Sequence, residues 1–174
     1  MPKANEAAPP EAPLDCPFCP RLFDFRAANK RAHPDWFNAP VPSFGDLSGR
    51  LLIVGLAPGL QGANRTCRPF TGDYAGDLLY STLAKYGCST GAYASHPDDG
   101  VQLTDALISN AVRCVPPENK PTGAEIVECR QFLISRIRQL PNLKVVLALG
   151  RIAHDSAVRA LEAQDVGIPG DPLE

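Results

Sequence analysis

Three short aliphatic segments mark out the chain. Residues 51–54 are wholly aliphatic and lead into a glycine- and proline-rich turn at residues 55–59. Residues 107–112 form a second apolar segment, which the polar Asn110 interrupts, and residues 143–149 form a third that ends at a glycine. Segments of this length, bounded by Gly and Pro, are typical of buried strands. The pattern therefore predicts three buried strands.

Helical periodicity follows each of these segments. Leucines recur at helical spacing in residues 77–86, and residues 151–163 carry alanine and leucine in the same way. Residues 122–125 match a capping box that opens a further helix. The apolar positions of that helix are Ile126, Cys129, Leu133, Ile137 and Leu140. Strands that alternate with amphipathic helices predict an α/β fold, with three layers (α/β/α) around a central parallel sheet.

Composition narrows the class of protein. A chain of 174 residues with 44% hydrophobic residues suits one globular domain, and residues 1–13, rich in Ala, Pro and Glu, are predicted to be a disordered leader to a domain at 14–174. The chain lacks an apolar run of the roughly 20 residues that a membrane span needs. The net charge of −2 argues against a protein that coats nucleic acid, but it allows an enzyme that contacts a few phosphates.

Six cysteines in a chain with no export signal favour metal ligands or buried thiols over disulfides. Cys16 and Cys19 form a Cys-x-x-Cys pair that can share one metal centre, and Cys114 and Cys129 can complete a set of four thiolates. Thiolate ligands suit an iron–sulfur cluster and zinc equally, so both remain open on the residues alone. The other two cysteines are interpreted as buried thiols.

Several blocks of residues agree, in order, with one known family. They are residues 55–59, 63–66, 68–73, 109–121 and 149–155. Together they resemble the motifs of family 5 (type b) uracil-DNA glycosylases. The resemblance implies a base-excision repair enzyme that hydrolyses the N-glycosidic bond of uracil in DNA, with other deaminated bases as further candidates. It also implies a cytoplasmic monomer with DNA as its partner, no membrane association, and a [4Fe-4S] cluster on Cys16, Cys19, Cys114 and Cys129.

The resemblance also assigns roles within the site. It implies that Asp73 is the catalytic carboxylate, which steadies a cationic sugar or orients the attacking water. The base would be bound by Gly55, Leu56, Ala57, Pro58, Gly59, Phe70 and Asn110. DNA phosphates would be contacted by Arg65, Arg68, Lys120 and Arg151. His154 is interpreted as structural. The apolar Leu56 is the mark of the type b group, whereas Cys67 stands where the family has Gly.

The residues alone leave alternatives open for these roles. Asp73 can be a loop carboxylate that accepts backbone hydrogen bonds, Phe70 a core residue, and Asn110 a residue that caps the end of a strand. A non-enzymatic, metal-stabilised domain that binds nucleic acid is the competing function. A nucleotide site on residues 55–59 is disfavoured, since the loop lacks the Lys-Ser/Thr of a P-loop.

The end of the sequence carries one more expectation. In the family, the pattern continues after the last predicted helix with a strand that ends in a histidine-containing motif, and residues 167–174 contain neither. We therefore expect residues 143–149 to lie at an open edge of the sheet. We also expect residues 1–174 alone to be incomplete at the C-terminus and to excise bases weakly or not at all.

Overall fold

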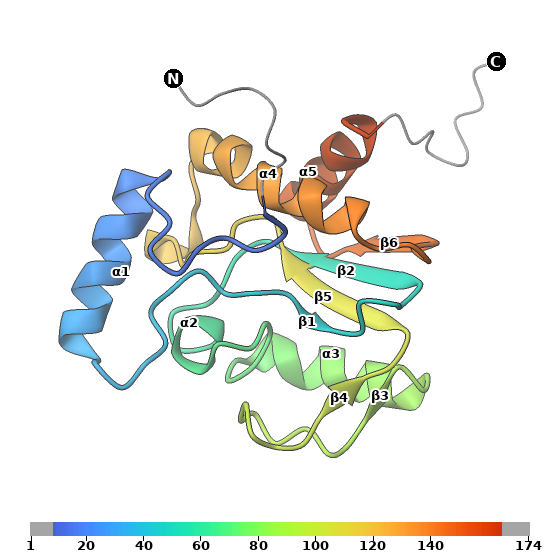
Figure 1. Ribbon diagram of the computed structural model, residues 1–174. Helices are drawn as coiled ribbons and strands as arrows, with labels where there is room; N and C mark the ends of the chain where they lie inside the picture. Colours follow the sequence, from blue (N-terminus) through green and yellow to red (C-terminus); the bar gives the residue numbers. More distant parts are fainter. Residues whose placement is uncertain (1–8, 165–174) are drawn as a thin grey trace.

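The computed structural model describes residues 9–164, which fold into a four-stranded sheet between two layers of helices (Figure 1). The strand order is β1-β5-β2-β6. β2 (Leu51–Gly55) pairs in parallel with β5 (Ala106–Asn110) on one side and with β6 (Val145–Ala148) on the other. The three strands and the α/β class predicted from the aliphatic pattern are thus confirmed.

A fourth, short strand was not predicted. β1 (Phe44–Gly45) pairs antiparallel with β5, so the sheet is mostly rather than wholly parallel. Two further short strands, β3 (Ser89–Thr90) and β4 (Gln102–Leu103), form a separate antiparallel pair. Strands of two residues are too short to leave a hydrophobic pattern in the sequence.

Five α-helices and one 3-10 helix connect these strands in the described part of the chain. They are α1 (Pro20–Ala32), α2 (Ala63–Thr66), α3 (Tyr74–Lys85), η1 (Pro117–Asn119), α4 (Gly123–Arg138) and α5 (Arg151–Glu162). The predicted capping box at the start of α4 is complete, because the Thr122 hydroxyl accepts from the Glu125 N–H and the Glu125 carboxylate accepts from the Thr122 N–H. None of the helices in this part of the chain is long and apolar enough to cross a membrane.

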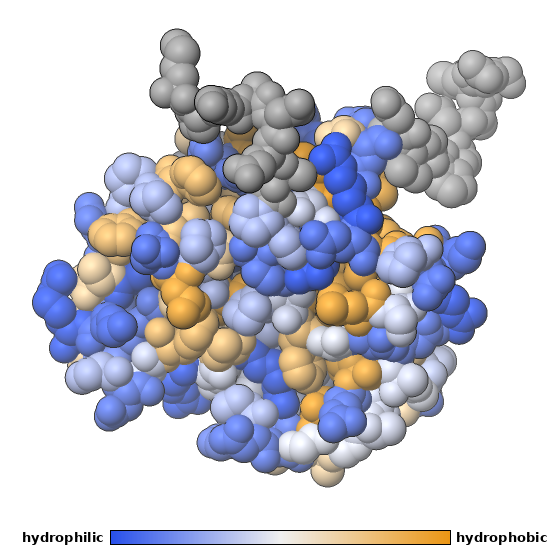
Figure 2. All heavy atoms as spheres, in the orientation of Figure 1, coloured by the Kyte–Doolittle hydropathy of each residue, from blue (hydrophilic) through white to orange (hydrophobic). Residues whose placement is uncertain are grey.

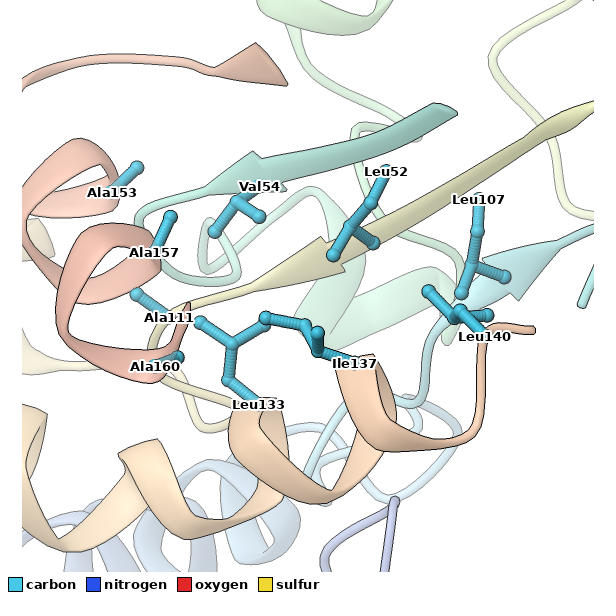
Figure 3. Close-up of a cluster of buried hydrophobic side chains, with 10 residues drawn as sticks. All are labelled: Leu52, Val54, Leu107, Ala111, Leu133, Ile137, Leu140, Ala153, Ala157 and Ala160. Carbon is cyan, nitrogen blue, oxygen red and sulfur yellow. The ribbon is translucent and has the colours of Figure 1, made fainter. Parts of the chain in front are cut away.

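Two hydrophobic cores lie on opposite faces of the sheet. Leu52 and Val54 of β2 point to one face, where α4 and α5 cover them (Figure 3). That core contains Leu52, Val54, Leu107, Ala111, Leu133, Ile137, Leu140, Ala153, Ala157 and Ala160. Ile53 points to the other face, against Leu79 and Leu83 of α3. This alternation along β2 explains why the strand is aliphatic throughout, since both faces are covered.

β6 lies at the edge of the sheet in the part of the chain that the structure describes. It pairs with β2 alone, and its side chains Val145 and Leu147 are 55% and 45% exposed. Within the described residues β6 thus has one neighbouring strand, and the open edge expected at this segment stays a prediction. The other expectation, that residues 167–174 lack the further strand and histidine motif of the family, concerns residues outside the described part of the chain.

The N-terminal segment differs from the leader predicted over residues 1–13. Glu11 forms ion pairs with Arg113, at 2.8 Å, and with Arg136, whose side chains are 1% and 7% exposed. Residues 9–13 are therefore attached to the domain, while residues 1–8 lie outside the described part. α1 was also not predicted, because it buries only Leu22 and Arg26 and so has no apolar stripe.

The surface is mixed in character. Figure 2 shows hydrophilic and hydrophobic residues interspersed over the face seen in Figure 1. The net charge of the whole chain is only −2. Any contact with DNA must therefore depend on local features of the surface.

Candidate active site

A cavity of about 270 Å³ opens where β2 and β5 end. It is lined by Leu56, Ala57, Pro58, Gly59, Ala63, Phe70, Asp73, Ala75, Asn110, Asn119 and Leu149. The structure thus brings together Asp73 and all of the residues predicted to bind the base except Gly55. The volume is just below the range of about 300–1,000 Å³ that is usual for drug-sized ligands, which suits a single heterocycle. The site lies at the carboxyl ends of parallel strands, as expected for an α/β sheet.

Gly55 lies beside this cavity, and its lack of a side chain leaves room for the side chains of Asn110 and Phe70. It is paired with Asn110 across the β2–β5 ladder. A Cβ atom at Gly55 would lie 2.5 Å from Oδ1 of Asn110 and 2.6 Å from Cζ of Phe70. Only glycine therefore lets the amide and the aromatic ring close over the end of β2.

The Asn110 side chain is buried but not fully hydrogen-bonded. The residue is 2% exposed, and its Oδ1 atom has no hydrogen-bond partner among the described residues. Burying an amide without a partner is costly, and an asparagine that caps a strand would use this oxygen for a backbone N–H. The observation therefore weighs against the capping alternative and leaves an amide that can pair with a ligand in the cavity.

Phe70 is held in an unusual backbone conformation. Its φ of 53° lies in the left-handed region, which a phenylalanine rarely adopts. The Tyr93 hydroxyl donates to the Phe70 carbonyl at 3.1 Å, and the Tyr80 hydroxyl donates to the preceding carbonyl of Pro69 at 2.8 Å. The ring is only half-buried and lines the cavity, so Phe70 is more than a core residue.

The Asp73 carboxylate faces two elements at once. It is the N-cap of α3, and Oδ1 accepts a hydrogen bond from the Gly76 N–H at 3.2 Å. Oδ2 lies over the loop that follows β2, where Cβ atoms at Gly62 and Gly59 would be 2.5 and 3.3 Å away. The alternative of a carboxylate that accepts backbone hydrogen bonds thus holds for one oxygen, and the other is directed toward the loop that lines the cavity. The cap also starts α3 at Tyr74, three residues before the predicted start.

Arg68 does not lie on the surface, in contrast to the prediction that it contacts a phosphate. It is 4% exposed, and its guanidinium pairs with both oxygens of Asp99, at 2.8 and 2.7 Å. Three aromatic rings surround the guanidinium carbon at 5.2–5.7 Å: Phe44, Tyr80 and Tyr93. Nε donates to the Thr71 hydroxyl at 2.7 Å. Arg68 therefore supports the loop that carries Phe70 and Asp73 from within.

The unexpected Cys67 has a clear structural setting. It has φ 68°, which places it in the left-handed region at the C-cap of α2. Glycine is the usual residue in this conformation because it has no Cβ atom to strain. The sequence therefore carries a thiol at a position whose backbone favours glycine.

The other predicted phosphate contacts surround the cavity. Arg65, Lys120 and Arg151 are exposed, and each lies within two residues of a residue that lines the cavity. The ion pairs of Lys120 with Glu118 and of Arg151 with Asp155 are long, at 3.7 and 3.9 Å. These cations are therefore accessible to an anionic ligand at the rim.

Sequence reasoning missed part of this rim. Tyr74 is 88% exposed and stands between Asp73 and Ala75, which both line the cavity. Asn119, with φ 57°, lines the cavity from η1. Ala63, Ala75 and Leu149 supply apolar walls. The sequence signal for Tyr74 was an aromatic residue directly after the motif carboxylate.

The four predicted metal ligands come together at a second cavity. Cys16, Cys19, Cys114 and Cys129 all line it, between α1, α4 and the segment after β5. The Arg113 N–H donates to the Cys129 sulfur at 3.2 Å, which is the type of bond that stabilises a thiolate ligand. Among residues 9–164, no three Cys, His, Asp or Glu side chains converge on a point that could hold a single metal ion. The four thiols thus line one cavity without forming a site for a single ion among these residues.

Burial affects the chemistry of these thiols. It raises the pKa of Cys19 to about 11 and that of Cys114 to about 12, and it also raises the pKa of Cys129. Without metal these thiols stay protonated at neutral pH, so metal binding must release protons. Cys67 and Cys88 lie outside this cavity, but they are half-buried rather than buried as predicted.

Comparison with known proteins agrees with this geometry. The model of the uracil DNA glycosylase superfamily matches residues 42–170. The type-5 uracil-DNA glycosylase of Thermus thermophilus is 45% identical over 144 residues, which cover 79% of this chain and 65% of the relative. That of Pyrobaculum aerophilum is 38% identical over 154 residues, covering 86% and 68%. A type-4 uracil-DNA glycosylase of Thermotoga maritima is 32% identical over 131 residues, covering 75% and 60%.

The match is broad but does not span the relatives completely. The chain covers about two thirds of the length of the first two relatives. The superfamily match includes the loop after β2, the end of β5 and the start of α5, where the cavity lies. On these grounds, the chain belongs to the uracil DNA glycosylase superfamily and, within it, to the type-5 group.

Proposed function

We propose that the cavity at the ends of β2 and β5 binds a uracil base flipped out of DNA, and that the site hydrolyses its N-glycosidic bond. The observation that carries this proposal is the buried Asn110 amide, whose oxygen has no partner among the described residues. It sits in a cavity of suitable size that also contains an aromatic ring and a carboxylate. Other deaminated bases of similar size are further candidates.

Recognition of the base begins with stacking and pairing. The Phe70 ring forms one wall and can stack on an extruded base, as aromatic side chains do for flipped nucleotides. The Asn110 amide offers both a donor and an acceptor to the edge of a pyrimidine. The N–H groups of Ala57 and Gly59 have no acceptor within residues 9–164, so they can donate to a base oxygen.

Bond cleavage needs charge stabilisation at the sugar and at the base. The sugar gains cationic character as the bond breaks, and the departing base becomes anionic. The Asp73 carboxylate is held by the N-terminus of α3 and can steady the sugar or orient the attacking water. The amide of Asn110 and the loop N–H groups stabilise the base anion. Closure of Gly55, Phe70 and Asn110 over the strand end excludes water from the base side.

The experiment is an excision assay on oligonucleotides that contain one uracil. Asp73→Asn is expected to slow single-turnover excision on the order of 10²–10³-fold with little change in DNA affinity, because it removes a transition-state interaction. Asn110→Ala is expected to weaken recognition of the base. Asp24→Asn, which changes an exposed carboxylate on α1, is the control and should match the unaltered protein.

The same assay separates the alternatives. A protein that binds DNA but excises no base would favour the non-enzymatic nucleic-acid-binding domain. Full activity in both site variants would overturn the assignment of Asp73 and Asn110. The expectation that residues 1–174 excise weakly is tested beside the full-length Thermus thermophilus relative, and comparable turnover would overturn it.

We further propose that Cys16, Cys19, Cys114 and Cys129 hold a [4Fe-4S] cluster. All four thiols line one cavity between α1, α4 and the segment after β5, and shared ligation of one centre requires such an arrangement. When bound, the cluster would link the start of α1 to β5 and α4. Protein purified without oxygen should be brown and contain iron and sulfide. A colourless protein with one zinc ion per chain would refute the cluster.

A further inference from the structure

Arg26 is a buried cation whose charge is not balanced in the described part of the chain. The residue is 4% exposed and lines the same cavity as the four cysteines. Its terminal nitrogens donate to the carbonyls of Leu14, at 2.9 Å, and Cys16, at 2.8 Å, and its Nε has no partner among the residues that the structure describes. Residues 9–164 place no carboxylate within ion-pair distance of it. A guanidinium in this state is costly, since an unpaired buried charge lacks both water and a counter-ion.

The helix explains why Arg26 reaches the cavity. Cys19 is the N-cap of α1, Arg26 lies seven residues later, and both side chains line the cavity. Leu22, between them in the sequence, is 1% exposed and also lines the cavity. The same geometry that presents Cys19 to the cavity therefore brings a positive charge beside it.

The other arginine at the cavity is already paired. Arg113 is 1% exposed, and its side chain is bound to the Glu11 carboxylate at 2.8 Å. Its backbone N–H donates to the Cys129 sulfur. Arg113 thus supplies a hydrogen bond to one ligand, whereas the charge of Arg26 remains available.

We propose that Arg26 is the counter-ion of the cysteine centre and retains its metal by compensating the charge of the thiolates. This rests on the proposed metal centre. Four thiolates carry more negative charge than a zinc ion or the core of a four-iron cluster neutralises, so the centre stays anionic in either case. An anion and a cation that are buried together stabilise each other where each alone is costly.

A purely structural role is the competing explanation. Arg26 holds two carbonyls of the Leu14–Cys16 segment and lies 5.5 Å from the centre of the Phe23 ring. These contacts account for two of its nitrogens, but they do not balance its charge. The two explanations differ in the result that they expect for Arg26→Lys. Lysine keeps the positive charge, so it satisfies a counter-ion role, but it cannot reproduce both carbonyl contacts of the planar guanidinium, as a structural role requires.

The test uses the full chain, purified without oxygen, and compares Arg26→Gln with Arg26→Lys. Arg130→Gln is the matched control. Arg130 follows Cys129 in the sequence and also has a buried Nε without a partner, but it does not line the cavity. Three quantities are measured: metal bound per chain, the rate at which a chelator removes it, and the midpoint potential if the metal is iron.

Arg26→Gln is expected to release its metal at least about tenfold faster, which is the usual scale for losing a group just outside the ligands. It should also lower the midpoint potential, because the reduced cluster is more negative and loses its compensating cation. Arg26→Lys should stay close to the unaltered protein in both, as should Arg130→Gln.

Each other outcome counts against the proposal. If Arg26→Gln has the same rate of metal release and the same midpoint potential as the unaltered protein, the counter-ion role is wrong, but the proposed metal centre is not affected. If Arg26→Lys loses metal as fast as Arg26→Gln does, the role of Arg26 is structural. The same conclusion holds if Arg26→Gln does not fold and Arg26→Lys folds without retaining metal. If the unaltered protein binds neither iron nor zinc, the proposed centre is itself wrong and this inference falls with it.

Discussion

Asp99 neutralises the buried Arg68, and we expect Asp99→Asn to destabilise the protein more than any exposed carboxylate change. The pair is bidentate, with nitrogen–oxygen distances of 2.8 and 2.7 Å, and the two side chains are 5% and 2% exposed. Asparagine keeps the shape of the side chain but removes its charge. The guanidinium then remains buried among aromatic rings without a counter-ion.

The structure sets the size of the effect. Removing one partner of a buried ion pair costs about 3–5 kcal/mol. The rings of Phe44, Tyr80 and Tyr93 still surround Arg68 in the variant and continue to stabilise the cation. We therefore expect the lower end, about 3 kcal/mol. For a domain of this size, 1 kcal/mol corresponds to roughly 2–4 °C in Tm, which gives a decrease of roughly 6–12 °C.

The pH dependence follows from the same pair. The Arg68 guanidinium holds the pKa of the Asp99 carboxyl well below its usual range. Because the folded-state pKa is lowered, the pair contributes its full stability above the unfolded-state pKa of about 3.9 and loses it as the pH falls further. The difference in unfolding free energy between the unaltered protein and Asp99→Asn should be full at pH 7 and should shrink below about pH 4.

Thermal and urea unfolding at several pH values measure this difference. Asp98→Asn is the matched control. The Asp98 side chain is next to Asp99 in the sequence and is 88% exposed, so this change should leave Tm unchanged. Adding Arg68→Met to Asp99→Asn should recover much of the loss, because it removes the unpaired charge. An Asp99→Asn protein with the Tm of the unaltered protein would show that the pair contributes nothing and that our account of Arg68 is wrong.

Three further predictions concern the two sites. Gly62→Ala should slow excision and shift the helix cap, since a Cβ there would lie 2.5 Å from the Asp73 carboxylate; equal single-turnover rates would refute this. Cys129→Ser should remove the metal and lower Tm strongly, whereas Cys88→Ser should do neither, as metal analysis and unfolding will show. Tyr74→Ala should weaken binding to uracil-containing DNA, because the exposed ring at the rim can stack on a neighbouring base, while Tyr74→Phe should bind normally in a fluorescence titration.

The sequence predicted the central elements because both faces of the sheet are covered. β2 is aliphatic on both faces for this reason, as is most of β5, and α4 and α5 carry regular apolar stripes against one face of the sheet. α1 was missed because its attachment depends on Leu22 and on the polar contacts of Arg26, which leave no periodic pattern. β1 was missed because two residues carry too little pattern.

The motifs predicted where the cavity residues would gather, but not how each would be held. Asp73 and Asn110 both line the cavity, and the resemblance to the family had assigned both of them to the site. Arg68 was expected at a phosphate, because sequence gives no sign that Asp99, thirty-one residues later, would bury it. The dual role of Asp73, as helix cap and cavity wall, likewise depends on the fold of the loop around Gly62.

The bond between Glu11 and the two arginines has a practical consequence for protein production. The first thirteen residues have the composition of a dispensable tail, and a shortened version for crystallisation would naturally begin at residue 14. Such a version would leave Arg113 and Arg136 facing each other without their shared carboxylate. The residues just before Cys16 would also lose the attachment to the domain that Glu11 provides. Poor yield or loss of colour from such a trimmed protein would then reflect the choice of starting residue rather than a failure of the domain itself.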